Sequence, residues 1–102
     1  MLEHLTIDTF SPLLGDPFTL HLDAARTMAV QLAEVTDLSD AARSTPPEGQ
    51  RTPFSIVFRS ASNSALPQGI YRLEHATLGD FEPFLVTIGP DAGGMRYEAV
   101  FT

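Results

Sequence analysis

The sequence predicts an all-β domain of about six antiparallel strands that form a small barrel or a sandwich, with a short helical turn near the N-terminus. Three observations support this. Apolar and polar residues alternate with a period of two over most of the chain. Stretches rich in Gly, Pro, Asn and Asp separate these segments. No repeated β-α-β pattern is present. An antiparallel meander with one apolar face must curl or pack against another sheet to bury that face.

The first element expected is a helical turn over residues 8–14. Ser11 before Pro12 is typical of a cap followed by a first-turn proline, and Gly15 can close the turn. This turn would lay three apolar side chains across one end of the core: Phe10, Leu13 and Leu14.

Two strands are predicted over 18–23 and 27–35, joined by the hairpin sequence DAAR. The alternative is a helix over 24–36, because Ala, Met, Gln, Leu and Glu all favour helices. We prefer the strand because the alternation continues from one segment into the next. The apolar face of the two strands would carry Phe18, Leu20, Leu22, Met28, Val30 and Leu32.

Residues 37–53, DLSDAARSTPPEGQRTP, predict a long Pro-rich surface loop. A loop of about 15 residues is uncommon in a compact domain and is usually functional or mobile. Whether it becomes ordered when a partner binds is left open.

Four further strands are predicted over 53–60, 69–76, 81–89 and 95–102, and PDAGG is expected to form a turn. On the third of these strands Phe84, Val86 and Ile88 share a face. The other inner faces would carry Phe54, Ile56, Phe58, Tyr71, Leu73, His75, Tyr97, Ala99 and Phe101. A filled core is favoured by six phenylalanines that can face inward: Phe10, Phe18, Phe54, Phe58, Phe84 and Phe101.

Length and composition limit the kinds of function that the protein can have. The 102 residues fit a single β domain over 1–102. The absence of Cys excludes disulfides, thiolate metal sites and cysteine nucleophiles. Six Arg, no Lys and thirteen acidic residues give a net charge of −7, which argues against nucleic-acid and anionic-membrane partners. Arg and Ala without Lys are typical of a GC-rich bacterial genome.

No apolar run approaches the ~20 residues that a membrane span needs. The start, MLEHLTIDTF, has no basic region before an apolar stretch, so it does not resemble a secretory signal. We expect a cytoplasmic protein, with export by a route that uses no cleaved signal as the alternative.

The tripeptide LEH occurs twice and places a carboxylate beside an imidazole. We expect His75 to face inward, to donate one ring proton to a loop carbonyl and to accept at the other nitrogen, which would fix the turn that follows. Its neighbour Glu74 would face the opposite way. The alternative is a metal ligand or general base. His4 would be solvated or in a subunit contact and His21 would face outward, so no metal site or cofactor is predicted.

The sequence gives little support for an enzyme. The chain has no G-x-S-x-G, P-loop or G-x-G-x-x-G sequence. Three serines, Ser60, Ser62 and Ser64, are expected in a turn. The enzyme alternative is therefore a hydrolase-like protein with His75 and Asp80 as its acid–base pair, and we predict no catalytic residue.

The outer face of the sheet offers charged and apolar candidates. Arg59 and Arg72 are expected to form cross-strand ion pairs with the acids Glu74, Glu82 or Glu98. Val57, Ile70 and Val100 fall on the same face. If these three cluster, they would mark an interface.

The chain resembles a family of small bacterial proteins of unknown function. The resemblance covers nearly the whole chain and rests on four motifs. They are an N-terminal Phe with an L-L-G-x-x-F step (10–18), an F-S-x-x-F strand (54–58), a Q-G-x-Y-x-L-E-H segment (68–75) and a terminal Y-E-A-V-F (97–101). It departs from the pattern at FEPF, where Pro83 indicates an edge strand or a bulge. The resemblance implies a turn at Gln68 and Gly69, a sharp reversal at Gly79 and an association with phage-tail-collar or fibre-like proteins.

The function expected from these observations is a non-enzymatic structural or accessory protein that acts through protein–protein contacts, with itself or with a fibre- or tail-like protein. A small-ligand-binding β-barrel is the second hypothesis, and the hydrolase with His75 and Asp80 is the third.

Overall fold

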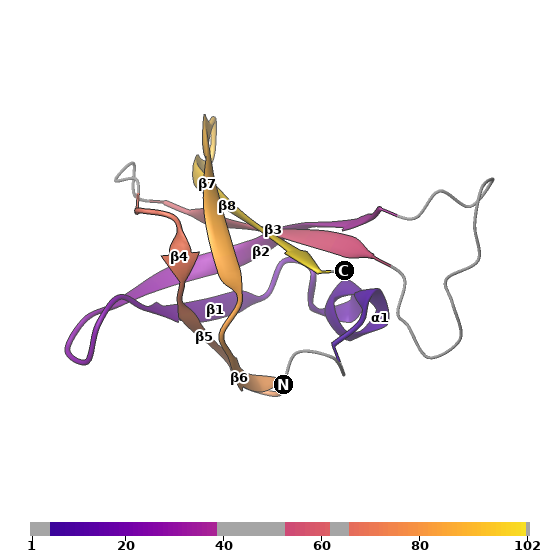
Figure 1. Ribbon diagram of the computed structural model, residues 1–102, viewed down its shortest axis with the longest axis horizontal. Helices are drawn as coiled ribbons and strands as arrows, with labels where there is room; N and C mark the ends of the chain where they lie inside the picture. The colour runs from indigo at the N-terminus through magenta and orange to yellow at the C-terminus, as the bar shows by residue number, and fades with distance from the viewer. Residues whose placement is uncertain (1–4, 39–52, 62–65, 102) are drawn as a thin grey trace.

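The computed structural model describes residues 5–38, 53–61 and 66–101. His4, Ser62, Ser64 and most of the predicted loop over 37–53 lie outside the described residues. All strand pairs are antiparallel and form one curled sheet, a half-barrel, so the predicted all-β fold is confirmed (Figure 1). The elements in chain order are α1 (Ile7–Phe10), the 3-10 turn η1 (Ser11–Leu13), β1 (Pro17–His21), β2 (Thr27–Asp37), β3 (Phe54–Ser60), β4 (Gly69–Ile70), β5 (Arg72–His75), β6 (Gly79–Phe81), β7 (Phe84–Asp91) and β8 (Gly94–Phe101).

The predicted meander is wrong, because the strand order is β4-β7-β8-β3-β2-β1-β5-β6. The chain from β4 to β7 forms a long bent hairpin. Its two ladders keep one register, with Gly69 opposite Leu85 and Leu73 opposite Phe81. Between them the N–H of Tyr71 donates to the carbonyl of Pro83 at 3.2 Å. One part of the hairpin pairs with β8 and another with β1, so it connects both ends of the curled sheet. The strand predicted over 69–76 is therefore divided into β4 and β5, and the strand predicted over 81–89 covers the end of β6 and most of β7.

Residues 27–37 are a strand, which rejects the helix alternative over 24–36. The side chains of Val30 and Leu32 are buried on the same face as Phe18 and Leu20 of β1. The turn between β1 and β2 is held by Asp23, whose Oδ1 accepts from the backbone N–H groups of two following residues, Ala25 and Arg26.

The N-terminal helix begins earlier than predicted. Thr6, not Ser11, is the cap, and its N–H donates to Oγ1 of Thr9 at 3.1 Å. Phe10 is fully buried as expected. Leu14 is 54% exposed, contrary to prediction, because the chain leaves the helical conformation there with ψ of 127°.

Aromatic rings fill the inside of the curled sheet. The Phe10 ring lies 5.5 to 5.9 Å from three other ring centroids, those of Phe54, Phe81 and Phe101. In Figure 1, α1 lies beside the end of β8, where the chain terminates. The helix thus brings Phe10 against rings from three strands and closes one end of the core.

Two predicted faces are wrong. Phe84 faces outward and is 50% exposed, while Phe81 and Leu85 are buried. The buried side chains of this segment are the odd-numbered ones, including Pro83, so the even-numbered apolar residues face out. Val57 was expected on an exposed face but is only 4% exposed, because β3 is buried along nearly its whole length.

Candidate interaction surface

His75 is buried at the end of β5, and both of its ring nitrogens are occupied. Nδ1 accepts from the backbone N–H groups of Thr77 and Leu78, each at 3.1 Å. Nε2 must therefore carry the proton, and it donates to Oδ2 of Asp16 at 2.9 Å. The turn after β5 is fixed as predicted, but the acceptor is a carboxylate instead of a loop carbonyl.

Asp16 is in turn held by β2. Its carbonyl accepts from the N–H of Leu32 at 3.0 Å, and the N–H of Gly15 donates to the Leu32 carbonyl at 2.8 Å. The imidazole therefore ties β5 to the segment that precedes β1. This arrangement requires the long-range packing of three chain segments, and no local sequence signal predicts it.

Asp80, the predicted acid–base partner of His75, makes no hydrogen bond with this imidazole. Its carboxylate lies 3.7 Å from Nη1 of Arg72 on the exposed side of the sheet. The ring of His75 instead packs against Phe18, with centroids 4.7 Å apart. The structure thus separates the two residues of the enzyme hypothesis.

The second histidine–acid pair lies on the outer face. His21, which faces outward as predicted, has its Nε2 2.8 Å from Oε1 of Glu74. Nη2 of Arg72 lies 3.2 Å from Nδ1 and 3.5 Å from Nε2 of the same ring, so the guanidinium group lies over the imidazole. Arg72 thus contacts His21 and Asp80, where ion pairs with Glu74, Glu82 or Glu98 were expected. The adjacent residues Glu74 and His75 serve two separate contacts on opposite faces.

Arg59 also has a different partner from those predicted, which were Glu74, Glu82 and Glu98. Its Nε and Nη2 donate to the two carboxylate oxygens of Asp91, at 3.0 and 2.6 Å. The N–H of Gly93 donates to Oδ1 of the same carboxylate at 2.8 Å. These hydrogen bonds, from Arg59 first and Gly93 second, hold the pKa of Asp91 below its ordinary value of 3.8. The pair fastens the β7–β8 turn to the end of β3.

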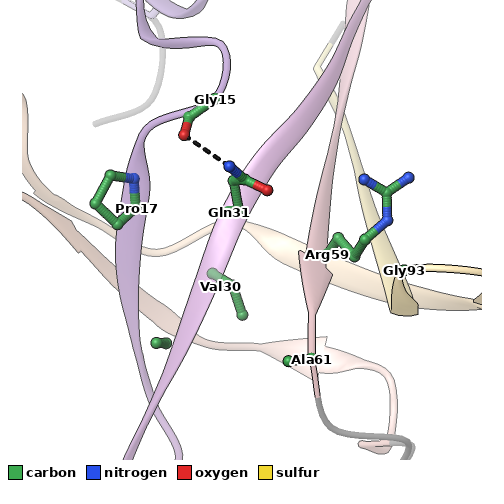
Figure 2. A pocket seen from close by; sticks show the side chains of 8 residues that line it. Gly15, Pro17, Val30, Gln31, Arg59, Ala61 and Gly93 are labelled. Carbon is green, nitrogen blue, oxygen red and sulfur yellow. Dashed lines mark hydrogen bonds between the residues drawn. The ribbon is translucent and has the colours of Figure 1, made fainter.

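Two open hollows of about 300 and 540 Å³ are lined by residues of β1 and β2 together with neighbouring segments. Figure 2 shows the first, where the Gln31 amide is turned towards Gly15 and donates to its carbonyl at 2.9 Å. Arg59 lines the same hollow, but its guanidinium is bound to Asp91. The second hollow lies beside His75 and Glu74, whose side chains already have the partners given above. Neither hollow therefore gathers uncommitted charged groups.

Ser60 is not in a turn as predicted but is the last residue of β3 and is buried. Its Oγ lies 3.5 Å from the sulfur of Met28. Over residues 5–38, 53–61 and 66–101, no three His, Asp or Glu side chains gather where they could hold a metal ion. In the same residues no helix has the length and apolar character that a membrane crossing requires.

The exposed apolar side chains gather on one face. Of the seven large exposed apolar residues in the described part of the chain, all but Leu14 and Leu38 lie on the outer face of β4, β7 and β8. Ile70 lies directly opposite Phe84, and Val86 follows on the same face of β7. We call these residues the outer apolar patch: Ile70, Phe84, Val86, Ile88 and Val100. Ile70 and Val100 were predicted to be exposed here, whereas the three residues of β7 were missed.

No curated protein and no solved structure matches the chain. A family model described as a domain of unknown function, DUF6916, matches residues 5–101, so the chain belongs to this family.

Proposed function

We propose that the protein is a non-enzymatic structural or accessory protein that acts by binding another protein. The observation that carries this proposal is the outer apolar patch. Ile70 is 68% exposed, Val100 55% and Phe84 50%, on one face of adjoining strands. Exposed apolar side chains gathered on one face are typical of contact sites, because covering them removes apolar surface from water.

The chemistry of the described histidines supports a role without catalysis. A general base needs a ring nitrogen within reach of a substrate proton. His75 uses both nitrogens internally, because Nε2 donates to Asp16 and Nδ1 accepts from two backbone N–H groups. His21 is held between Glu74 and Arg72.

A small-ligand-binding barrel has less support. Ligand sites are concave and mostly apolar. Here Phe18 contacts the rings of Phe58 and Phe81, and Phe10 contacts those of Phe54, Phe81 and Phe101. Aromatic side chains therefore occupy the inside of the sheet. The two hollows described above are lined in part by polar side chains, Gln31 and Arg59 in one and Thr19 and Glu74 in the other.

The setting that we propose is a phage-tail-like or fibre assembly, into which the protein is recruited after synthesis in the cytoplasm. The motifs from Phe54 to Phe58 and from Gln68 to His75 support this through the family resemblance that they carry. A compact domain with one apolar face suits an accessory component of such an assembly.

Site-specific photo-crosslinking in the producing cells tests the proposal. A photoreactive residue at Ile70 or Val86 should give a discrete adduct of higher mass, whose second component mass spectrometry identifies. The matched control is Leu14, which is 54% exposed but lies outside the patch. Equal crosslinking at Leu14 and Ile70, or no adduct at either patch position, would contradict a role in protein binding.

A further inference from the structure

We infer that the outer apolar patch binds a different polypeptide, whose contact surface is apolar with Arg or Lys at its edge, and not a second copy of this chain. The inference rests on the proposed function and adds the chemistry of the partner to it. Two independent features of the described residues lead to it: the way in which β7 is protected along its edge, and the charges beside the patch.

In the described residues β7 pairs with β8 on one side and, at Phe84 and Leu85, with β4 on the other, and its remaining edge is unsuited to the addition of a partner strand. The register shifts between Thr87 and Gly89, which is a bulge, and Pro90 follows within the strand. A bulge and a proline are devices that prevent strand addition, since one distorts the ladder and the other removes a donor. Contact with a partner is therefore expected through the side chains of the outer face.

Two acidic side chains border the patch. Glu98 lies directly opposite Val86 in the ladder between β7 and β8, and Glu82 precedes Pro83 and Phe84 in the chain. Within the described residues neither carboxylate has an ion pair or a side-chain hydrogen bond. Both are therefore available to cations on a partner.

The neighbouring arginines are already committed. Arg72 contacts His21 and Asp80, as described above. Nε of Arg96 donates to the carbonyl of Gly89 at 3.3 Å and lies 3.9 Å from the Asp91 carboxylate. The border of the patch thus has acids without partners and cations with partners.

A second copy is a poor occupant for this surface. A two-fold contact uses the same surface on both subunits, so it would bring Glu82 and Glu98 from both copies to one interface. Like charges across an interface are unfavourable, and the chain as a whole carries a net charge of −7 without any Lys. A partner with Arg or Lys around an apolar centre matches both features.

Matched synthetic peptides test the inference. Two peptides share a Leu- and Phe-rich centre and differ only in their flanks, which carry Lys in one and Glu in the other. We expect the Lys peptide to bind the full chain about tenfold or more tightly than the Glu peptide. Chemical-shift changes in ¹H–¹⁵N spectra should concentrate at Ile70, Phe84, Val86 and Glu98. Light scattering should report a monomer.

Three substitutions refine the experiment. Phe84→Ser should weaken binding of the Lys peptide, whereas Leu14→Ser, at a comparably exposed position, should not. Glu98→Gln should weaken binding of the Lys peptide alone, and so should added salt. Equal binding of both peptides, failure of the Lys peptide to bind, shifts elsewhere on the surface, or a dimer that Phe84→Ser dissociates would each overturn the inference. If a partner is crosslinked but its binding changes neither with Glu98→Gln nor with added salt, the proposed function holds and only the inferred charge of the partner is rejected.

Discussion

Nε2 of His75 lies 2.9 Å from Oδ2 of Asp16, a residue 59 positions away in the sequence. This hydrogen bond joins the end of β5 to the segment between η1 and β1. The opposite nitrogen accepts two backbone N–H groups of the following turn. One buried ring therefore holds a turn and a long-range contact together.

Replacing His75 by Ala should destabilise the fold by about 2–4 kcal/mol, because two backbone N–H groups and one carboxylate lose their partner and a cavity opens beside Phe18. His21→Ala is the matched control. It removes an imidazole that is 19% exposed on the outer face and should cost about 1 kcal/mol or less. Urea unfolding measures both, and equal losses would contradict the structural role of His75.

The glycines of two turns should differ in their tolerance of a side chain. Gly94 has φ of 130°, and a Cβ there would lie 1.8 Å from the carbonyl oxygen of Ser60. Gly79 has φ of 88°, but its added Cβ would meet nothing within 4 Å. Gly79→Ala should cost about 1–2 kcal/mol from backbone strain alone. Gly94→Ala should cost clearly more because β3 must move. Thermal unfolding compares the two, and an equal decrease in Tm would show that the backbone accommodates the clash.

Much of the fold could be predicted from the sequence because alternation reports which side chains meet the core. It identified the buried faces of β1, β3 and β8, and it favoured strand over helix for residues 27–35. It failed at β7, where both alternating sets are apolar. Phe84, Val86 and Ile88 form the more apolar set, but Phe81, Pro83 and Leu85 face inward.

The candidate contacts were harder to predict, because they join segments that only the strand order brings together. Arg59 pairs with Asp91 since β8 lies between β3 and β7. A meander of consecutive strands places these residues differently. The exposure of Ile70 was predictable, because it follows from the alternation of inward and outward side chains along one predicted strand.

Acidification should loosen the β7–β8 turn. Arg59 holds the pKa of Asp91 below 3.8, so this contribution to stability is present above the ordinary carboxyl pKa. It is lost as the pH falls through the lowered pKa of the folded protein. Arg59→Gln should raise the titration midpoint of the Asp91 carboxyl, as ¹³C NMR can measure. The carboxyl of Asp23, whose pKa is lowered by the Ala25 N–H and Arg26, should titrate unchanged in the same variant. A shift of both midpoints would point to a general change in the fold.

Truncation of two adjacent residues of β7 should change the stability of the fold by very different amounts. Leu85 is 1% exposed and belongs to the core, so Leu85→Ala should cost about 2–5 kcal/mol. Phe84 is 50% exposed, so Phe84→Ala should change the stability of the isolated chain by about 1 kcal/mol or less. Chemical denaturation monitored by circular dichroism measures both. The reverse order would mean that the alternation of β7 is shifted by one residue. The outer apolar patch would then be part of the core, and the proposed binding surface would not exist.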